Sequence, residues 1–141
     1  MAAAGFKALA LALACTACTS MAADQRTFDG TGWNVTAING QPTTGSGDFI
    51  VRFDNGQIGG RLGCNHFGGP YRVSGDIMTV GSVAATQMAC ESALDTPHIS
   101  PMQFESWSFA ILGSPMRIGW KGDGRLTLSN AAGSIDLLRA R

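Results

Sequence analysis

Short runs of alternating apolar residues, separated by glycine-containing turns, are the feature that most restricts how this chain can fold. Phe49, Val51 and Phe53 share one face of such a run, and Asn55-Gly56 follows before the next run. Asn-Gly between alternating runs is the strongest short-range hairpin signal, because both residues tolerate positive φ. Comparable runs recur about every 8–12 residues from Trp33 onward, a spacing typical of an antiparallel sheet or barrel.

One segment departs from this alternation. Ser100-Pro101 has the form of a helix start, since Ser caps the first turn and Pro suits the first helical position. Three apolar residues then recur at helical spacing: Phe104, Trp107 and Ile111. We therefore expect a helix over residues 101–112, ended by Gly113, whereas residues 83–94 stay open between strand, loop and short helix. The expected fold class is α+β, with β dominant.

Residues 1–23 have the composition of an export signal. Lys7 supplies one positive charge, residues 8–14 form a short apolar run, and small residues follow. The apolar run is far below the ~20 residues that a membrane-spanning helix needs. Residues 24–30 are expected to be a tether and residues 31–141 to form the folded domain.

The leader allows two outcomes. Small residues before Cys15, and less closely before Cys18, resemble a bacterial lipobox, in which the cysteine becomes the lipidated first residue. Cleavage after Ala22 or Ala23 would instead release a soluble protein. Both outcomes place the domain outside the cytosol, in the periplasm or on the periplasm-facing side of the outer membrane. A lipid anchor would make the membrane a partner.

Charge and motifs argue against two function classes. Ten Lys and Arg balance ten Asp and Glu, so the formal net charge is zero, and we expect no nucleic-acid partner. The sequence has no nucleophile elbow, no His-Glu-x-x-His motif and no phosphate-binding loop. We therefore expect no catalytic residues and no cofactor, and the chain is predicted not to be an enzyme.

Three segments of the sequence resemble motifs of the META domain family, which includes bacterial heat-shock proteins. They are Gly63-Cys64-Asn65, the following Tyr71, and Thr86-Gln87-Met88-Ala89-Cys90. The resemblance covers about residues 31–139 and implies a mostly antiparallel sheet that curls as a partial barrel around one helix. It also implies export or surface attachment and a link to envelope stress, with no established catalytic activity. The family often has a glutamate after the second cysteine, and Glu91 and Glu105 are both candidates.

Cys64 and Cys90 are expected to form a structural disulfide, because an oxidising compartment favours pairing of two cysteines in a small domain. Two alternatives remain open. The cysteines could be buried reduced thiols, or they could bind zinc together with His66 and His98, although the spacing differs from known zinc motifs. We expect no metal site.

Aromatic residues suggest a second role for the domain. Most should pack in the core, but four could line an apolar cleft between sheet and helix: Trp33, Phe53, Trp107 and Trp120. Four arginines alternate with apolar residues on the expected strands: Arg52, Arg61, Arg72 and Arg117. They should form a solvated outer face of the sheet, or a patch that binds acidic lipid head groups. The expected function is that of an exported, non-enzymatic envelope protein linked to stress tolerance. The alternative is a binding module for a small apolar ligand or peptide, and an unidentified envelope protein is a further possible partner.

Overall fold

The structure is a computed structural model that describes residues 28–44, 47–90 and 99–141. The leader, the first residues of the tether, Glu91 and His98 lie outside these ranges. The elements in chain order are β1 (Thr31–Ile38), β2 (Gln41–Pro42), β3 (Phe49–Asp54), β4 (Gln57–Leu62), β5 (His66–Ser74), β6 (Ile77–Val80), β7 (Ala84–Ala85), α1 (Pro101–Leu112), β8 (Met116–Gly122), β9 (Arg125–Asn130) and β10 (Gly133–Arg139).

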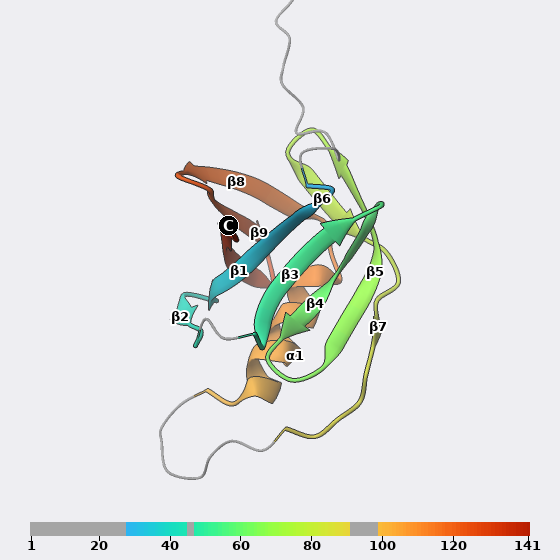
Figure 1. Cartoon of the computed structure of the whole chain (residues 1–141), viewed down its shortest axis with the longest axis vertical. Helices are drawn as coiled ribbons and strands as arrows, with labels where there is room; N and C mark the ends of the chain where they lie inside the picture. Colours follow the sequence, from blue (N-terminus) through green and yellow to red (C-terminus); the bar gives the residue numbers. More distant parts are fainter. Residues whose placement is uncertain (1–27, 45–46, 91–98) are drawn as a thin grey trace, which may run out of the picture.

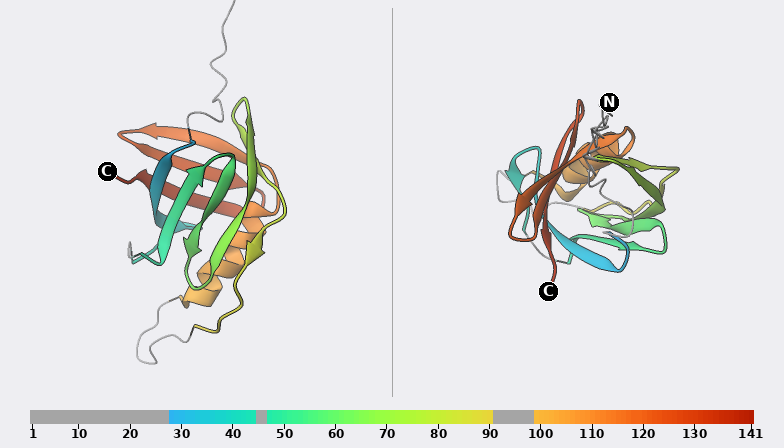
Figure 2. Two further views of the ribbon diagram at one scale, coloured as in Figure 1. Left: turned by 45° about the vertical axis from the view of Figure 1, so that its right-hand side comes forward. Right: turned by 90° about the horizontal axis from the view of Figure 1, so that it is seen from above.

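The sheet is antiparallel and closes on itself (Figures 1 and 2). In the described part of the chain, eight strands follow one another around the barrel in the order β1-β3-β4-β5-β6-β8-β9-β10. Pairing of β10 with β1 completes the ring, with Trp33 opposite Arg139 and Ile38 opposite Ile135. The β-dominant antiparallel architecture is confirmed, but the expected partial barrel is wrong in one respect. The first and last strands meet, which satisfies the hydrogen-bonding edges that an open sheet would expose.

The turns follow the local sequence signals. Asn55 and Gly56 have φ values of 49° and 73°, the left-handed conformation that a two-residue hairpin turn requires. They join β3 to β4, in which Phe53 lies opposite Ile58. Asn39-Gly40 takes the same conformation after β1. The predicted hairpin is therefore confirmed, together with its turn type.

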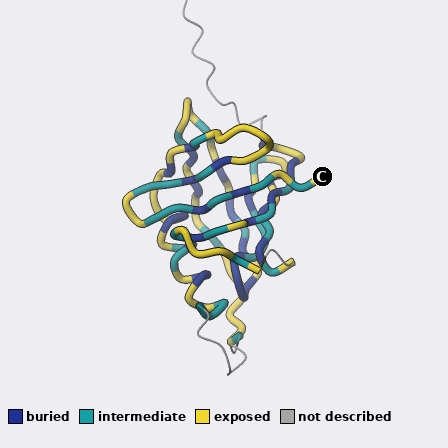
Figure 3. Tube along the Cα trace, turned by 90° about the vertical axis from the view of Figure 1, so that its left-hand side faces the viewer, coloured by how far each residue is buried: buried dark blue, intermediate teal, exposed yellow. Residues whose placement is uncertain are grey.

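Helix α1 occupies the predicted residues and closes one end of the barrel. The Ser100 side chain caps it by accepting a hydrogen bond from the backbone N–H of Gln103, at 3.1 Å. The buried apolar residues of α1 are Phe104, Ile111 and Leu112, and the helix lies against β1, β4 and β10. Buried and more exposed residues alternate along strands such as β1 and β3 (Figure 3), as expected when one face of each strand forms the core. No helix of the described residues is long and apolar enough to cross a bilayer.

Candidate functional site

The connection between β4 and β5 lies directly under the start of α1. Gly63 has a φ of 134°, and a side chain there would place its Cβ 2.2 Å from the carbonyl oxygen of Pro101. Only glycine avoids this clash and adopts this backbone conformation without strain. The first residue of the Gly63-Cys64-Asn65 motif is therefore needed for the close approach of helix and loop.

The second motif residue forms the predicted disulfide. Cys64 and Cys90 are bonded, with their Cα atoms 5.7 Å apart, and Cys64 is fully buried. The bond joins the β4–β5 connection to the end of the extended segment 83–90. Both sulfur atoms are used in this bond, so the two thiolates of the alternative zinc site are not present. The described residues hold no cluster of three or more potential metal-binding side chains.

Asn65, the third motif residue, connects three parts of the chain. Its side-chain oxygen accepts hydrogen bonds from the Met88 backbone N–H at 2.6 Å and from the Thr86 hydroxyl at 3.0 Å. Its side-chain nitrogen donates to the Met88 carbonyl at 3.2 Å and to Glu105 at 2.8 Å. Every side-chain hydrogen-bonding group of this buried asparagine is thus used, which explains the amide at this position.

Glu105 is the candidate glutamate that lies in the described part of the chain, and it contacts the motif. It lies on the buried face of α1, is only 6% exposed, and accepts from the Asn65 backbone N–H at 2.5 Å and from the Asn65 side chain. The helical periodicity hid this role, because Glu105 lies next to Phe104 on the core side of α1. We define Cys64, Asn65, Thr86, Met88 and Glu105, with Cys90, as the motif hub.

A groove opens over the motif hub between segment 83–89 and α1. Its volume is about 520 Å³. The walls are largely apolar: Val83, Ala85, Met88, Ala89, Met102 and Phe109. Met88 and Met102 are 53% and 40% exposed, and together with Trp120 they are the exposed large apolar residues of the described chain. Methionine adapts its shape easily and is common on surfaces that bind apolar partners.

One wall of this groove is the edge of a strand. Among the described strands, β7 pairs with β5 alone, with Ala84 opposite Gly68 and Ala85 opposite Phe67. Thr86 continues the ladder by donating its N–H to the His66 carbonyl at 2.9 Å. Because antiparallel ladders alternate, the backbone groups of Ala85 and Gln87 point away from β5. The groove thus combines an open strand edge with an apolar wall, the combination used to bind extended peptides.

The four aromatic residues predicted to line a cleft lie at opposite ends of the barrel. Trp33 and Phe53 are fully buried and pack with Phe28, whose ring lies 6.2 Å and 5.0 Å from theirs. Trp120 contacts Phe28 and Trp33 at the same end. Trp107 instead packs edge-on against Phe104 on α1. The sequence missed the actual groove because no periodicity marks Met88 and Met102 as neighbours.

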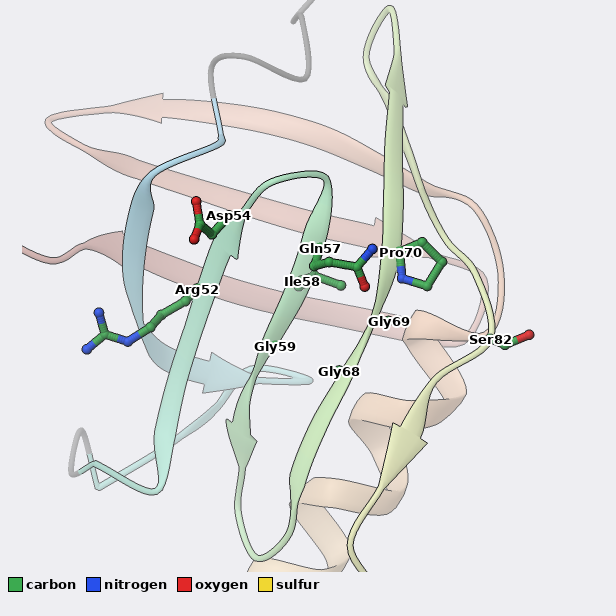
Figure 4. Close-up of a pocket in the computed structure, with 9 residues that line it drawn as sticks. All are labelled: Arg52, Asp54, Gln57, Ile58, Gly59, Gly68, Gly69, Pro70 and Ser82. Carbon is green, nitrogen blue, oxygen red and sulfur yellow. The ribbon is translucent and has the colours of Figure 1, made fainter.

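Of the four arginines predicted to form an outer face, two are held in ion pairs, while Arg72 is exposed on β5. Arg61 pairs with Asp48 at 2.7 Å and donates two hydrogen bonds to the Cys64 carbonyl, so it supports the motif hub. Arg117 pairs with Asp76 at 2.6 Å. Arg52 lines a shallow hollow of about 590 Å³ on the outside of β3–β5 (Figure 4). There Gly59 and Gly68 lie opposite each other, and because neither has a side chain, the backbone of β4 and β5 is uncovered.

Tyr71, the remaining motif residue, ties the start of the domain to β5. Its hydroxyl donates to Asp29 at 2.5 Å, and Asp29 also accepts from the Gly56 N–H at 3.1 Å. Burial raises the pKa of the Tyr71 phenol well above its usual value, and the hydrogen bond and negative charge of Asp29 raise the pKa further. The neutral phenol is therefore the form that the folded protein holds.

Comparisons with known proteins show the fold and the family. Solved structures share the fold, among them two NMR structures. An NMR structure of a protein from Burkholderia xenovorans is 18% identical, with a TM-score of 0.62, over 82% of this chain and 86% of that one. A second NMR structure is 20% identical, with a TM-score of 0.66, over 81% and 92% of the two chains. No curated protein matches. The sequence profile of the META domain matches residues 26–141, and the chain therefore belongs to the META domain family.

Proposed function

We propose that this protein is an exported component of the cell envelope, held by a lipid on Cys15 or Cys18, that supports stress tolerance by binding and not by catalysis. Three features support the proposal: the leader composition, the family, and the disulfide within the motif hub. The proposed site of action is the periplasm or the periplasm-facing side of the outer membrane.

The Cys64–Cys90 disulfide is the observation that carries this proposal. It closes a loop over segment 65–89, and in the chain-entropy model such a closure stabilises the folded state by about 3.5 kcal/mol. Disulfides of this kind persist in oxidising compartments and are rare in the cytosol. A domain that depends on this bond is suited to conditions in which other envelope proteins unfold.

The test measures the lipidation and disulfide of the protein and the stress survival of cells that carry it. Intact-mass measurement of protein from the envelope fraction should give an acylated species that begins at Cys15 or Cys18, with two hydrogens fewer than the reduced domain. A strain lacking the protein should survive envelope heat stress less well than a strain carrying it. Complementation with Cys64→Ala/Cys90→Ala should restore survival less well than the unchanged protein. Cytosolic protein with two alkylatable domain thiols would contradict the proposal.

The groove supports a second candidate function, binding of an extended apolar peptide segment. The exposed methionines and the open edge of β7 favour this ligand over a compact molecule. A fluorescent heptapeptide of alternating leucine and threonine is a direct probe, with binding followed by anisotropy on the full chain.

Matched variants on one helix turn test the peptide candidate. Met102→Lys places a charge in the groove and should weaken peptide binding about tenfold, the loss expected from one buried apolar side chain. Gln103→Lys adds the same charge at the next, exposed position, which does not line the groove, and should leave binding unchanged. Equal effects of the two substitutions, or no binding at all, would exclude this candidate.

A further inference from the structure

The end of the barrel opposite α1 carries a half-exposed tryptophan. The Trp120 ring lies 5.6 Å from Phe28 and 6.2 Å from Trp33, both fully buried, yet Trp120 itself is 47% exposed. No described residue hydrogen-bonds to its indole nitrogen. The ring thus rests on the core with one face and offers an apolar surface and a free N–H donor to its surroundings. Tryptophan with this environment is enriched at membrane–water interfaces.

Basic residues are concentrated in the strands and the turn that carry this ring. Residues 117–141 contain five basic and two acidic side chains, whereas the whole chain is neutral. Lys121, Arg125 and Arg141 are exposed and form no ion pair with any described residue, and the Arg139 guanidinium lies 5.8 Å from the Trp33 ring. We call Trp120, Lys121, Arg125, Arg139 and Arg141 the tryptophan rim.

The acidic residues near this end lie mostly outside the β8–β9 turn. Asp123 is in this turn, between Lys121 and Arg125, whereas Asp136 lies midway along β10, opposite Thr127. Asp29 lies beside Tyr71 and Gly56, and Asp54 lies at the end of β3 with Arg52. Arg117 is paired with Asp76 and is not part of the rim. The β8–β9 turn and the end of β10 thus carry four cationic side chains and one carboxylate, that of Asp123.

The chain enters the domain at this same end. Phe28 contacts Trp120, and it lies ten positions after Cys18 and thirteen after Cys15. A fully extended chain spans at most about 35 Å over ten positions and about 45 Å over thirteen. If the protein is anchored as proposed above, on which this inference rests, the tryptophan rim is held close to the bilayer.

We propose that the tryptophan rim contacts the surface of a bilayer that contains anionic phospholipid. The Trp120 ring would lie at the level of the head groups, and the Lys and Arg side chains would bind lipid phosphates. Each basic side chain near an anionic bilayer contributes about 1 kcal/mol, which is about a fivefold change in the contact equilibrium. The opposite end of the barrel, with the methionine-lined groove, would then face away from the membrane.

Quenching of tryptophan fluorescence by brominated lipid tests this contact. The full chain, purified from the envelope fraction, is reconstituted into vesicles of brominated phosphatidylcholine, with or without phosphatidylglycerol. The anchor holds the protein on both vesicles, so only the rim contact can differ. Quenching should be stronger with phosphatidylglycerol and should fall at about 1 M salt, where the Debye length is about 3 Å. Equal quenching on the two vesicles would overturn the inference.

Charge variants show whether the rim makes the contact. Lys121→Gln and Arg125→Gln should each lower, about fivefold, the ratio of molecules whose rim contacts the anionic bilayer to molecules whose rim does not. Arg72→Gln, which removes an equally exposed charge from β5, should leave quenching unchanged. An equal effect of Arg72→Gln, or no effect of the rim variants, would also overturn the inference. An intact mass without acyl chains would instead contradict the proposed anchor, independently of the quenching result.

Discussion

The two ends of the barrel are closed by different chemistry. At one end, α1 covers the strands, and the motif hub joins helix, loop and segment 83–90 through a disulfide and the hydrogen bonds of Asn65. At the other end, Phe28 fills the barrel beneath Trp120, and the contacts are between tilted aromatic rings. A covalent and hydrogen-bonded closure depends on a few specific side chains, whereas an aromatic closure depends on buried area. The family motif accordingly lies mostly at the first end.

Removing the aromatic closure should have the largest effect on stability. Phe28→Ala deletes a fully buried ring and leaves a cavity, so the free energy of unfolding should fall by about 4 kcal/mol. Denaturant unfolding followed by circular dichroism measures this loss. Phe28→Leu, which retains most of the volume, should lose much less. A small effect of Phe28→Ala would show that the aromatic end does not close the core.

Breaking the covalent closure should come next. Cys64→Ala/Cys90→Ala should lower the free energy of unfolding by about 3.5 kcal/mol, because the unfolded chain regains the entropy of the open loop. The same denaturant titration, with and without reductant, gives the comparison. Reductant should destabilise the unchanged protein and have no effect on the double variant. The same response of both proteins would contradict a structural role for the bond.

The hydrogen-bonded part of the motif hub should contribute less than the disulfide. Asn65→Ala leaves the Met88 N–H and one Glu105 oxygen without the partners they have now, and should cost about 2–3 kcal/mol. Thermal unfolding at matched pH is the measurement. Asn34→Ala, on β1 and without a hydrogen-bonded side chain among the described residues, should change stability by less than about 0.5 kcal/mol. Equal losses would mean that Asn65 acts only through its volume.

The smallest expected effect concerns the link between Tyr71 and Asp29. Tyr71→Phe removes one hydrogen bond and should cost about 1 kcal/mol near neutral pH. Because the folded-state pKa of Tyr71 is raised, this stabilisation is complete below the unfolded-state pKa near 10 and declines as the pH rises further. Unfolding measured from pH 7 to 11 should show a steeper alkaline decline for the unchanged protein than for Tyr71→Phe. Parallel curves would contradict the shifted pKa.

Much of the local structure could be predicted, since its signals lie within a few residues of one another. Ser100 caps the helix that its sequence indicates, and Asn55-Gly56 turns the chain where the alternation stops. The disulfide followed from the number of cysteines and the expected compartment. The contact of Glu105 with Asn65 could not be predicted, because it depends on where α1 packs relative to a residue forty positions earlier in the chain.

The sequence by itself determined the turns, the helix and which cysteines could pair, because each of these depends on adjacent residues or on simple chemistry. The tertiary structure decided that β10 pairs with β1, that Phe28 and Trp120 meet, and that Met88 and Met102 face one groove. Apolar side chains look equivalent along a sequence, and their burial depends on contacts between distant segments. Those contacts exist only when the barrel has closed.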